Sequence, residues 1–153
     1  MKVVLQRVSG ARVVSDNVLT GEIGQGLAIL FGAKTGDSRE MCEYLAKKIA
    51  NLRIFKDENG KLNRSVNDIG GEILVVSNFT LCGECDRGTR PNFSKAEGPE
   101  KAYELFKYFK ECLKSQGVKK VASGVFGSHM KLSLENDGPV TIILDTDELR
   151  AKK

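Results

Sequence analysis

Histidine is nearly absent from this sequence, whose 153 residues include only His129. A Ser-His-Asp arrangement therefore has one possible centre, and we interpret His129, next to Met130 at an expected strand start, as structural or exposed. The sequence also lacks a glycine-rich phosphate loop before a helix, because Gly21, Gly24 and Gly26 lie between expected strands. These absences argue against triad hydrolases and against nucleotide-dependent enzymes.

Cysteines are few, at positions 42, 82, 85 and 112. Cys82 and Cys85 have the two-residue spacing of metal and redox pairs, but a closed zinc site needs a second pair. Cys42 and Cys112 fall singly on the apolar faces of expected helices. We therefore assign no role to Cys82 and Cys85, and we expect neither a metal nor a cofactor. Reduced thiols are typical of intracellular proteins, so we expect a cytoplasmic protein.

Long apolar runs are missing too, since none approaches the roughly 20 residues of a membrane-spanning helix. The amino-terminal apolar run stops after three residues, so we expect neither a signal peptide nor a membrane partner. The net charge of +4 permits a nucleic-acid partner without requiring one. With 41% hydrophobic and 29% charged residues, the composition predicts one globular domain over residues 1–153.

Apolar patterns and turn residues predict strands at residues 2–9, 12–15, 18–23, 27–31, 53–55, 72–79, 119–125, 130–135 and 140–145. One helix is expected to open at Asp37, with Glu40 in capping-box spacing, and a second to begin at Pro99 and end at Gly117. Hairpin-connected strands with separate helices predict an α+β fold. We expect a strongly curved, partly barrel-like sheet with two main helices packed outside and a frayed tail at residues 148–153.

Residues 136–141 have the sequence Asn-Asp-Gly-Pro-Val-Thr and separate two expected strands. This turn chemistry predicts a hairpin tip. Pro139 cannot donate to a sheet ladder, which places it at a strand edge or start. A loop of this composition can present backbone carbonyls with no side chain in the way.

Ser77, Asn78, Phe79 and Thr80 follow the most apolar expected strand, where a long loop over residues 81–95 begins. Polar groups at the end of a rigid strand are typical of active sites. Ser77 and Thr80 have no evident base, which argues against nucleophilic catalysis. Backbone N–H groups there can still form an oxyanion hole, where one donor is worth roughly 2.7–4 kcal/mol. That suits an already activated ester.

Lysines follow the polar face of the second expected helix, at positions 101, 107, 110 and 114, with Lys119 and Lys120 beyond it. One interpretation is an ordinary solvated face. The other is a patch that contacts nucleic-acid phosphates. The sequence leaves both open.

The chain resembles the D-aminoacyl-tRNA deacylases over nearly its whole length. The resemblance rests on residues 5–8 (LQRV), 53–55 (RIF), 77–81 (SNFTL), 90–95 (RPNFSK), 124–127 (GVFG) and 136–141 (NDGPVT). It implies an α+β homodimer with its active site at the subunit interface. It further implies a hydrolase that cleaves the ester of D-aminoacyl-tRNA, and of mischarged glycyl-tRNA, as chiral proofreading in translation quality control.

The resemblance also implies roles for individual residues. Ser77 to Thr80, including Asn78, would line the catalytic pocket, and the backbone N–H of Phe79 would be the oxyanion donor. The family commonly has Gln where this chain has Asn78, and more often Ala at Ser128.

The selectivity residues implied by the resemblance lie elsewhere. Gly138 and Pro139 would form a cross-subunit Gly-cisPro motif that enters the other subunit's pocket and rejects L-amino acids by a clash. Arg7 would steady this loop, and Thr141 would belong to the same element. Two alternatives stay open: a non-catalytic tRNA- or RNA-binding module on the same fold, and a dimeric scaffold without a substrate.

Overall fold

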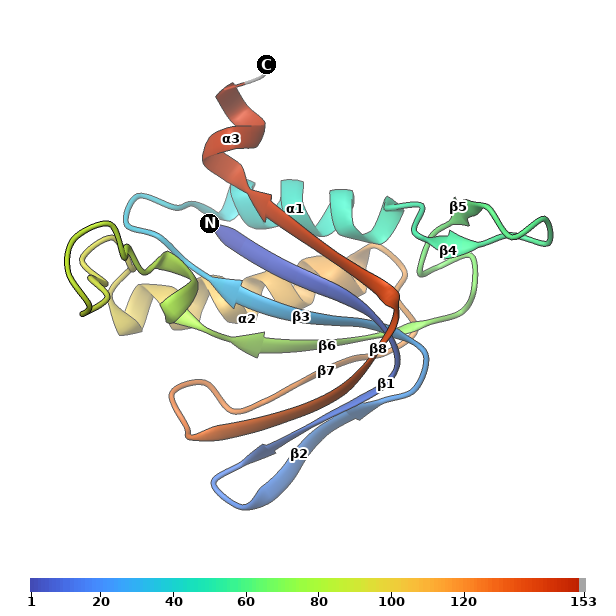
Figure 1. Cartoon of the computed structure of the whole chain (residues 1–153), viewed down its shortest axis with the longest axis horizontal. Coiled ribbons are helices and arrows are strands. Elements are labelled where there is room, and N and C mark those ends of the chain that lie inside the picture. The colour runs from blue at the N-terminus through green and yellow to red at the C-terminus, as the bar shows by residue number, and fades with distance from the viewer. Residues whose placement is uncertain (152–153) are drawn as a thin grey trace.

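The computed structural model describes residues 1–151 and is organised around one large sheet (Figure 1). The sheet contains β1 (Lys2–Ser15), β2 (Val18–Ile23), β3 (Gly26–Gly32), β6 (Glu72–Ser77), β7 (Val121–Ser123) and β8 (Met130–Asp145), and β4 (Phe55–Lys56) pairs separately with β5 (Leu62–Arg64). The helices are α1 (Arg39–Asn51), the 3₁₀ helix η1 (Phe79–Cys82), α2 (Pro99–Ser115) and α3 (Thr146–Ala151). No helix in this described part is long and apolar enough to cross a membrane.

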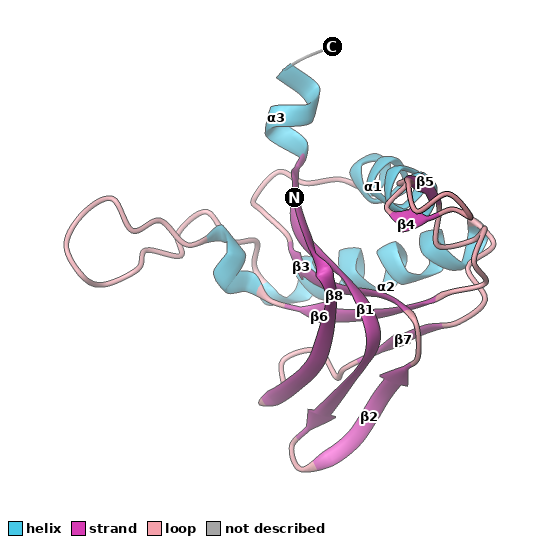
Figure 2. Ribbon diagram, turned by 45° about the vertical axis from the view of Figure 1, so that its right-hand side comes forward, coloured by secondary structure: helices cyan, strands magenta, loops and turns pink. Residues whose placement is uncertain are grey.

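The sheet is strongly curved because its long strand β1 changes partners along its length (Figure 2). Residues 2–8 of β1 pair antiparallel with β3, residues 11–15 pair with β2, and β8 follows β1 along both halves. β6 lies parallel to β3, and β7 lies parallel to β6. β2 returns close to β7, since a Cβ atom on Gly21 would lie 2.9 Å from the carbonyl oxygen of Ser123. The predicted α+β fold with a partly closed barrel is therefore confirmed.

Two apolar clusters fill the two faces of this sheet. One joins its outer face to α1 and α2, where the rings of Phe31 and Phe109 stack with centroids 4.9 Å apart. The other, around Val13, Leu74 and Val76, lies inside the curl. The predicted second helix is confirmed, because α2 starts at Pro99 and buries the expected stripe of Ala102, Leu105, Phe106, Phe109, Cys112 and Leu113.

The predicted hairpin tip at residues 136–141 is wrong. Both flanking runs belong to β8 and both pair with β1, with Thr141 opposite Gln6 and Asn136 opposite Val8. Residues 137–140 therefore bulge out of a continuing strand. Turn-forming residues indicate that a ladder is interrupted, but they do not show whether the chain reverses. The separate strands expected at residues 2–9 and 12–15 are likewise one strand, β1.

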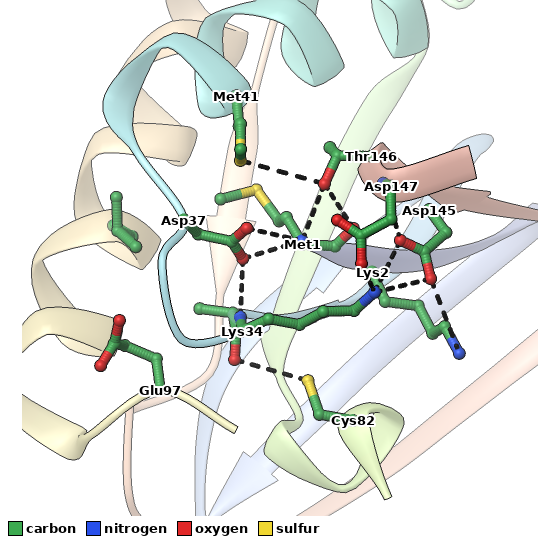
Figure 3. Close-up of polar contacts among 12 residues, drawn as sticks. Met1, Lys2, Lys34, Asp37, Met41, Cys82, Glu97, Asp145, Thr146 and Asp147 are labelled. Carbon is green, nitrogen blue, oxygen red and sulfur yellow. Dashed lines mark hydrogen bonds and ion pairs between the residues drawn. The ribbon is translucent and has the colours of Figure 1, made fainter. Parts of the chain in front are cut away.

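The first helix starts later than predicted, at Arg39 with Ser38 as its N-cap. Asp37 does not cap it, because its carboxylate accepts hydrogen bonds from the Met1 ammonium (2.8 Å) and the Lys34 N–H (2.6 Å). The Met1 ammonium also donates to the Thr146 hydroxyl at 2.8 Å (Figure 3). This cluster joins β1, the turn after β3 and the start of α3. The tail expected to fray begins within α3, and its residues 152–153 lie outside the described part.

We expect Asp37→Asn to lower the free energy of unfolding by about 3–5 kcal/mol, because it removes the counter-charge of a buried ammonium. Met1 and Asp37 are 0% and 4% exposed in this ion pair. Urea unfolding measures the change. Asp147→Asn is the control: Asp147 pairs with Lys34 but is 68% exposed, and its loss should not exceed about 1 kcal/mol. Equal losses from both substitutions would contradict this account.

Candidate active site

Ser77, Asn78 and Phe79 lie where β6 ends and line a pocket of about 480 Å³. Parallel pairing with β3 sets Ser77 beside Phe31 at one end of the sheet. The remaining wall comes from the end of β3, the start of α2 and the turn before β8, through Phe31, Ala33, Glu97, Pro99, Ala102, Phe126, Gly127, Ser128 and Met130. Sequence reasoning did not assign these wall residues to the site.

The chain leaves β6 through η1, and this determines which backbone groups are in use. The N–H of Asn78 donates to the Phe31 carbonyl at 2.7 Å, and the N–H of Leu81 donates to the Asn78 carbonyl at 3.3 Å. The helix itself makes no use of the N–H groups of Phe79 and Thr80, because they are its first two residues and have no acceptor three residues earlier within the helix. These groups are therefore suitable donors to a developing negative charge.

Thr80 has a hydroxyl that is hydrogen-bonded to the side-chain amide oxygen of Asn78. An amide oxygen is not a general base, so this contact does not activate the hydroxyl as a nucleophile. The residue Phe79 is 58% exposed. It meets Phe93 edge-on, with centroids 5.3 Å apart, which places part of the long loop beside the pocket.

Glu97 is a charged wall residue that the sequence did not single out. Its carboxylate accepts a hydrogen bond from the Gly98 N–H at 2.8 Å and pairs with Lys101 at 3.3 Å. These contacts, the Gly98 N–H first, lower the pKa of Glu97. The pocket wall therefore includes an ionised carboxylate at neutral pH. Its place just before the helix-starting Pro99 is the one local signal that could have indicated it.

Arg7, Gly138 and Pro139 form a second cluster at the bulge in β8. Arg7 is only 5% exposed, and its guanidinium donates to the carbonyls of Asp137 (2.9 Å) and Ile54 (2.8 Å). Gly138 has φ +136° and the Gly138–Pro139 peptide bond is cis. A Cβ atom on Gly138 would lie 3.0 Å from Nη2 of Arg7 and 2.9 Å from the nitrogen of Val140. Through these contacts Arg7 holds the bulge in place.

Thr141 follows this loop at the point where the ladder resumes. Its hydroxyl oxygen accepts hydrogen bonds from the side chains of Gln6 (3.2 Å) and Asn136 (3.1 Å). These two contacts close the bulge from the strand side, so Thr141 is positioned to stabilise the loop rather than to line the pocket.

A single chain does not bring the two clusters together. Arg7 is level with Leu27 and Ile73, four residues before Ser77 along β6. At about 3.3 Å per residue, that is about 13 Å along the strands. Figure 1 shows η1 and the bend of β8 at opposite ends of the sheet. The pocket and the bulge are therefore separate features of one protomer.

Three of the four expected lysines on α2 have an acidic partner three or four residues away in the sequence. Lys101, Lys107 and Lys114 pair with Glu97, Glu104 and Glu111, at 3.3, 2.8 and 3.1 Å. This pairing favours the interpretation as an ordinary solvated face.

The cysteines and His129 lie apart from any shared site. Cys82 is buried and donates to the Ala33 carbonyl at 3.4 Å, whereas Cys85 is exposed. Burial raises the pKa of Cys82, and raises that of Cys42 to about 12. Within residues 1–151 no three His, Cys, Asp or Glu side chains gather as metal ligands. His129 is exposed, and its N–H donates to the Asp16 carboxylate at 3.3 Å.

Comparison with known proteins gives matches along nearly the whole chain. A family model described as D-Tyr-tRNA(Tyr) deacylase matches residues 4–145. The chain is 54% identical over 149 residues to the D-aminoacyl-tRNA deacylase of Syntrophomonas wolfei subsp. wolfei, covering 97% of this chain and 99% of that protein. It is 53% identical over 150 residues to the D-aminoacyl-tRNA deacylase of Thermomicrobium roseum, covering 98% and 97%.

Two solved structures share the fold. One, described as a c-Myc DNA unwinding element binding protein, has a TM-score of 0.86 at 39% identity and covers 95% of this chain and 98% of its own. The other, described as a probable eukaryotic D-amino acid tRNA deacylase, has a TM-score of 0.79 at 19% identity and covers 94% and 98%. The second likeness concerns the fold alone.

Proposed function

The chain belongs to the D-Tyr-tRNA(Tyr) deacylase family, and from that premise we propose that it is a hydrolase of aminoacyl-tRNA esters. Its substrates are D-aminoacyl-tRNA and mischarged glycyl-tRNA, and its products are the free amino acid and tRNA. The observation that carries this proposal is the match to D-aminoacyl-tRNA deacylases over 97% of the chain. We propose that the chain forms a single domain and that this chiral proofreading takes place in the cytoplasm.

The reaction requires little from side chains. Water adds to the ester carbonyl carbon, the carbonyl oxygen takes up negative charge, and the bond to the ribose oxygen then breaks as that oxygen gains a proton. We assign the N–H of Phe79 as the donor to the oxyanion, supported by its place as the first residue of η1, where the helix offers its N–H no acceptor. Ser77 and Asn78 line the pocket around the ester, whereas Thr80, which was expected to line it as well, does not and instead holds the Asn78 side chain. The neighbouring 2′-hydroxyl of the substrate assists, so no triad is needed.

Selectivity against L-amino acids requires a second copy of the chain. Because the bulge of one protomer lies about 13 Å along the strands from its own pocket, we propose that Gly138 and Pro139 enter the pocket of the partner in a homodimer. Their carbonyls would crowd the substrate Cα, so that an L side chain clashes while glycine and D side chains fit. Arg7 and Thr141 hold the loop for this purpose.

Incubation with D-tyrosyl-tRNA and L-tyrosyl-tRNA tests the proposal directly. We expect release of D-tyrosine with the L ester left intact. Equal rates on both esters, or no cleavage of the D ester, would overturn the assignment. A DNA-binding description of one similar structure keeps a non-catalytic nucleic-acid-binding module as the second candidate. That candidate predicts tRNA binding without ester cleavage.

We expect Ser77→Ala and Thr80→Ala to keep kcat/KM within about tenfold of the parent, because backbone groups rather than hydroxyls stabilise the oxyanion. The Thr80 hydroxyl already bonds to the Asn78 amide, so its removal frees that amide without removing a base. Single-turnover deacylation measures the effect. Complete loss of activity in Thr80→Ala would instead identify a hydroxyl nucleophile.

A further inference from the structure

A second pocket, of about 370 Å³, lies at the base of the Gly138–Pro139 loop; its lining residues are Arg7, Gln25, Phe55, Lys56, Arg64, Ile69 and Asp137. We call it the basal pocket. It brings together β1, the β4–β5 hairpin and the bulge of β8, elements that are far apart in the sequence. Three of its side chains are cations and one is an acid. It is distinct from the pocket at the end of β6, with which it shares no residue.

The positive charge of the basal pocket is only partly neutralised. Asp137 lies 3.6 Å from Arg7. Among the described residues, neither Lys56 nor Arg64 has a carboxylate within ion-pair distance. The pocket therefore has two positive charges in excess of its acid, a composition that attracts anions.

The two nearby acids, Asp57 and Asp68, accept hydrogen bonds from backbone N–H groups. The Asp57 carboxylate accepts the N–H groups of Asn59 (2.9 Å) and Lys61 (3.0 Å). The Asp68 carboxylate accepts the Ser65 N–H at 2.8 Å, while its backbone carbonyl accepts a hydrogen bond from the Arg64 guanidinium at 2.7 Å. These contacts fix the hairpin and orient Arg64; both carboxylates keep their negative charge and act on Arg64 through space, but neither forms an ion pair with a cation of the basal pocket.

The position of the pocket identifies the anion. If the Gly138–Pro139 loop enters the partner's active site, as proposed above, the basal pocket lies at the rim of that site. The chain entering there is the single-stranded 3′ end of tRNA, whose terminal adenosine carries the ester and whose upstream units are joined by phosphodiesters. The α2 lysines are less suited to this contact, because three of them are paired with glutamates.

We propose that the basal pocket of one protomer binds a phosphodiester of the 3′-terminal segment of the aminoacyl-tRNA whose ester lies in the partner's pocket. Lys56 and Arg64 are the binding residues, and Arg7 completes the cationic wall. This inference rests on the proposed function and adds to it a means of favouring esters carried by RNA over free amino-acid esters. It also makes each active site depend on both protomers for binding RNA.

The test compares two substrates in the full-length protein. D-tyrosyl-tRNA carries the phosphodiesters, whereas D-tyrosyl-adenosine carries the same ester without any phosphate. We expect Lys56→Gln with Arg64→Gln to raise the KM for D-tyrosyl-tRNA about tenfold and to reduce the slope of log KM against log salt by about 1.4. Kinetics with D-tyrosyl-adenosine should not change.

Three controls accompany this comparison. Lys61→Gln removes a lysine of the same hairpin that does not line the pocket, and should leave both substrates unaffected. The charge-preserving pair Lys56→Arg with Arg64→Lys should restore the KM for D-tyrosyl-tRNA. The single variant Lys56→Gln keeps the bond from Arg64 to Asp68 and should give part of the effect.

The outcomes separate this inference from the proposed function. Equal changes with both substrates, or none with D-tyrosyl-tRNA, would overturn the phosphodiester site while leaving the hydrolase intact. If the parent cleaves neither substrate, the proposed function fails, and binding of 5′-phosphorylated CCA trinucleotide still tests the pocket. Weaker binding by the double variant than by the parent then supports the site, and equal binding refutes it.

Discussion

Gly138→Ala is expected to lower kcat/KM for D-aminoacyl-tRNA about 100-fold, because a displacement of about 1 Å at a reacting centre has an effect of this size. At φ +136° the backbone of Gly138 lies where L side chains are strained. The added Cβ would also lie 2.9 Å from the Val140 nitrogen and 3.0 Å from Nη2 of Arg7. The loop must therefore shift away from the Arg7 side chain that holds it.

Gly60→Ala is the matched control for this substitution. Gly60 also has a positive φ, +75°, but a Cβ atom there would meet nothing within 4 Å. Its variant should retain the parent's kcat/KM, with a small decrease in stability. Urea unfolding of both variants separates a local shift of the loop from loss of the fold. If Gly138→Ala kept the parent's rate and its preference for D esters, the loop would have no part in selection.

Local sequence patterns were sufficient to predict those parts of the fold that contacts within one segment determine. The apolar stripe of α2 follows helical spacing along one face, so its six buried residues were predictable. The bulge at residues 136–141 was not predictable from local sequence. Whether the chain reverses there or continues as one strand depends on β1, about 130 residues away, which pairs with both halves of β8. Asp37 was misplaced for the same reason, since the Met1 ammonium takes its carboxylate.

The candidate site likewise contains residues that local sequence predicts and residues that only tertiary contacts bring together. Ser77 to Phe79 were predicted because the end of an apolar strand and the family resemblance indicate the same place. Glu97 and the turn at residues 126–130 line the same pocket only through tertiary packing. Lys56 and Arg64 line the same pocket as Arg7 because β4 pairs with β5 next to the bulge. No periodicity in the sequence predicts that these three residues line one pocket.

Arg7→Lys is expected to reduce kcat/KM about 100-fold, again by allowing the loop to move by about 1 Å. The guanidinium of Arg7 donates to the carbonyls of Asp137 and Ile54 from two different nitrogens. A lysine keeps the charge but lacks this rigid fork, so one carbonyl loses its partner, at about 1–3 kcal/mol of folding free energy. Arg12→Lys, at an exposed arginine of the same strand, should change neither rate nor stability.

Combining Arg7→Lys with Gly138→Ala tests whether the two residues act as one element. Nη2 of Arg7 is the atom that a Cβ on Gly138 would approach, so either substitution alone already releases the loop. Neighbouring residues that share a contact are not additive, and the double variant should therefore lose little more activity than each single variant. A double variant whose loss equals the product of the two single losses would show that Arg7 acts independently of the loop. The free energy of unfolding, measured in the same variants, distinguishes coupling in the loop from general destabilisation, because general destabilisation lowers activity only where the variant unfolds under the assay conditions.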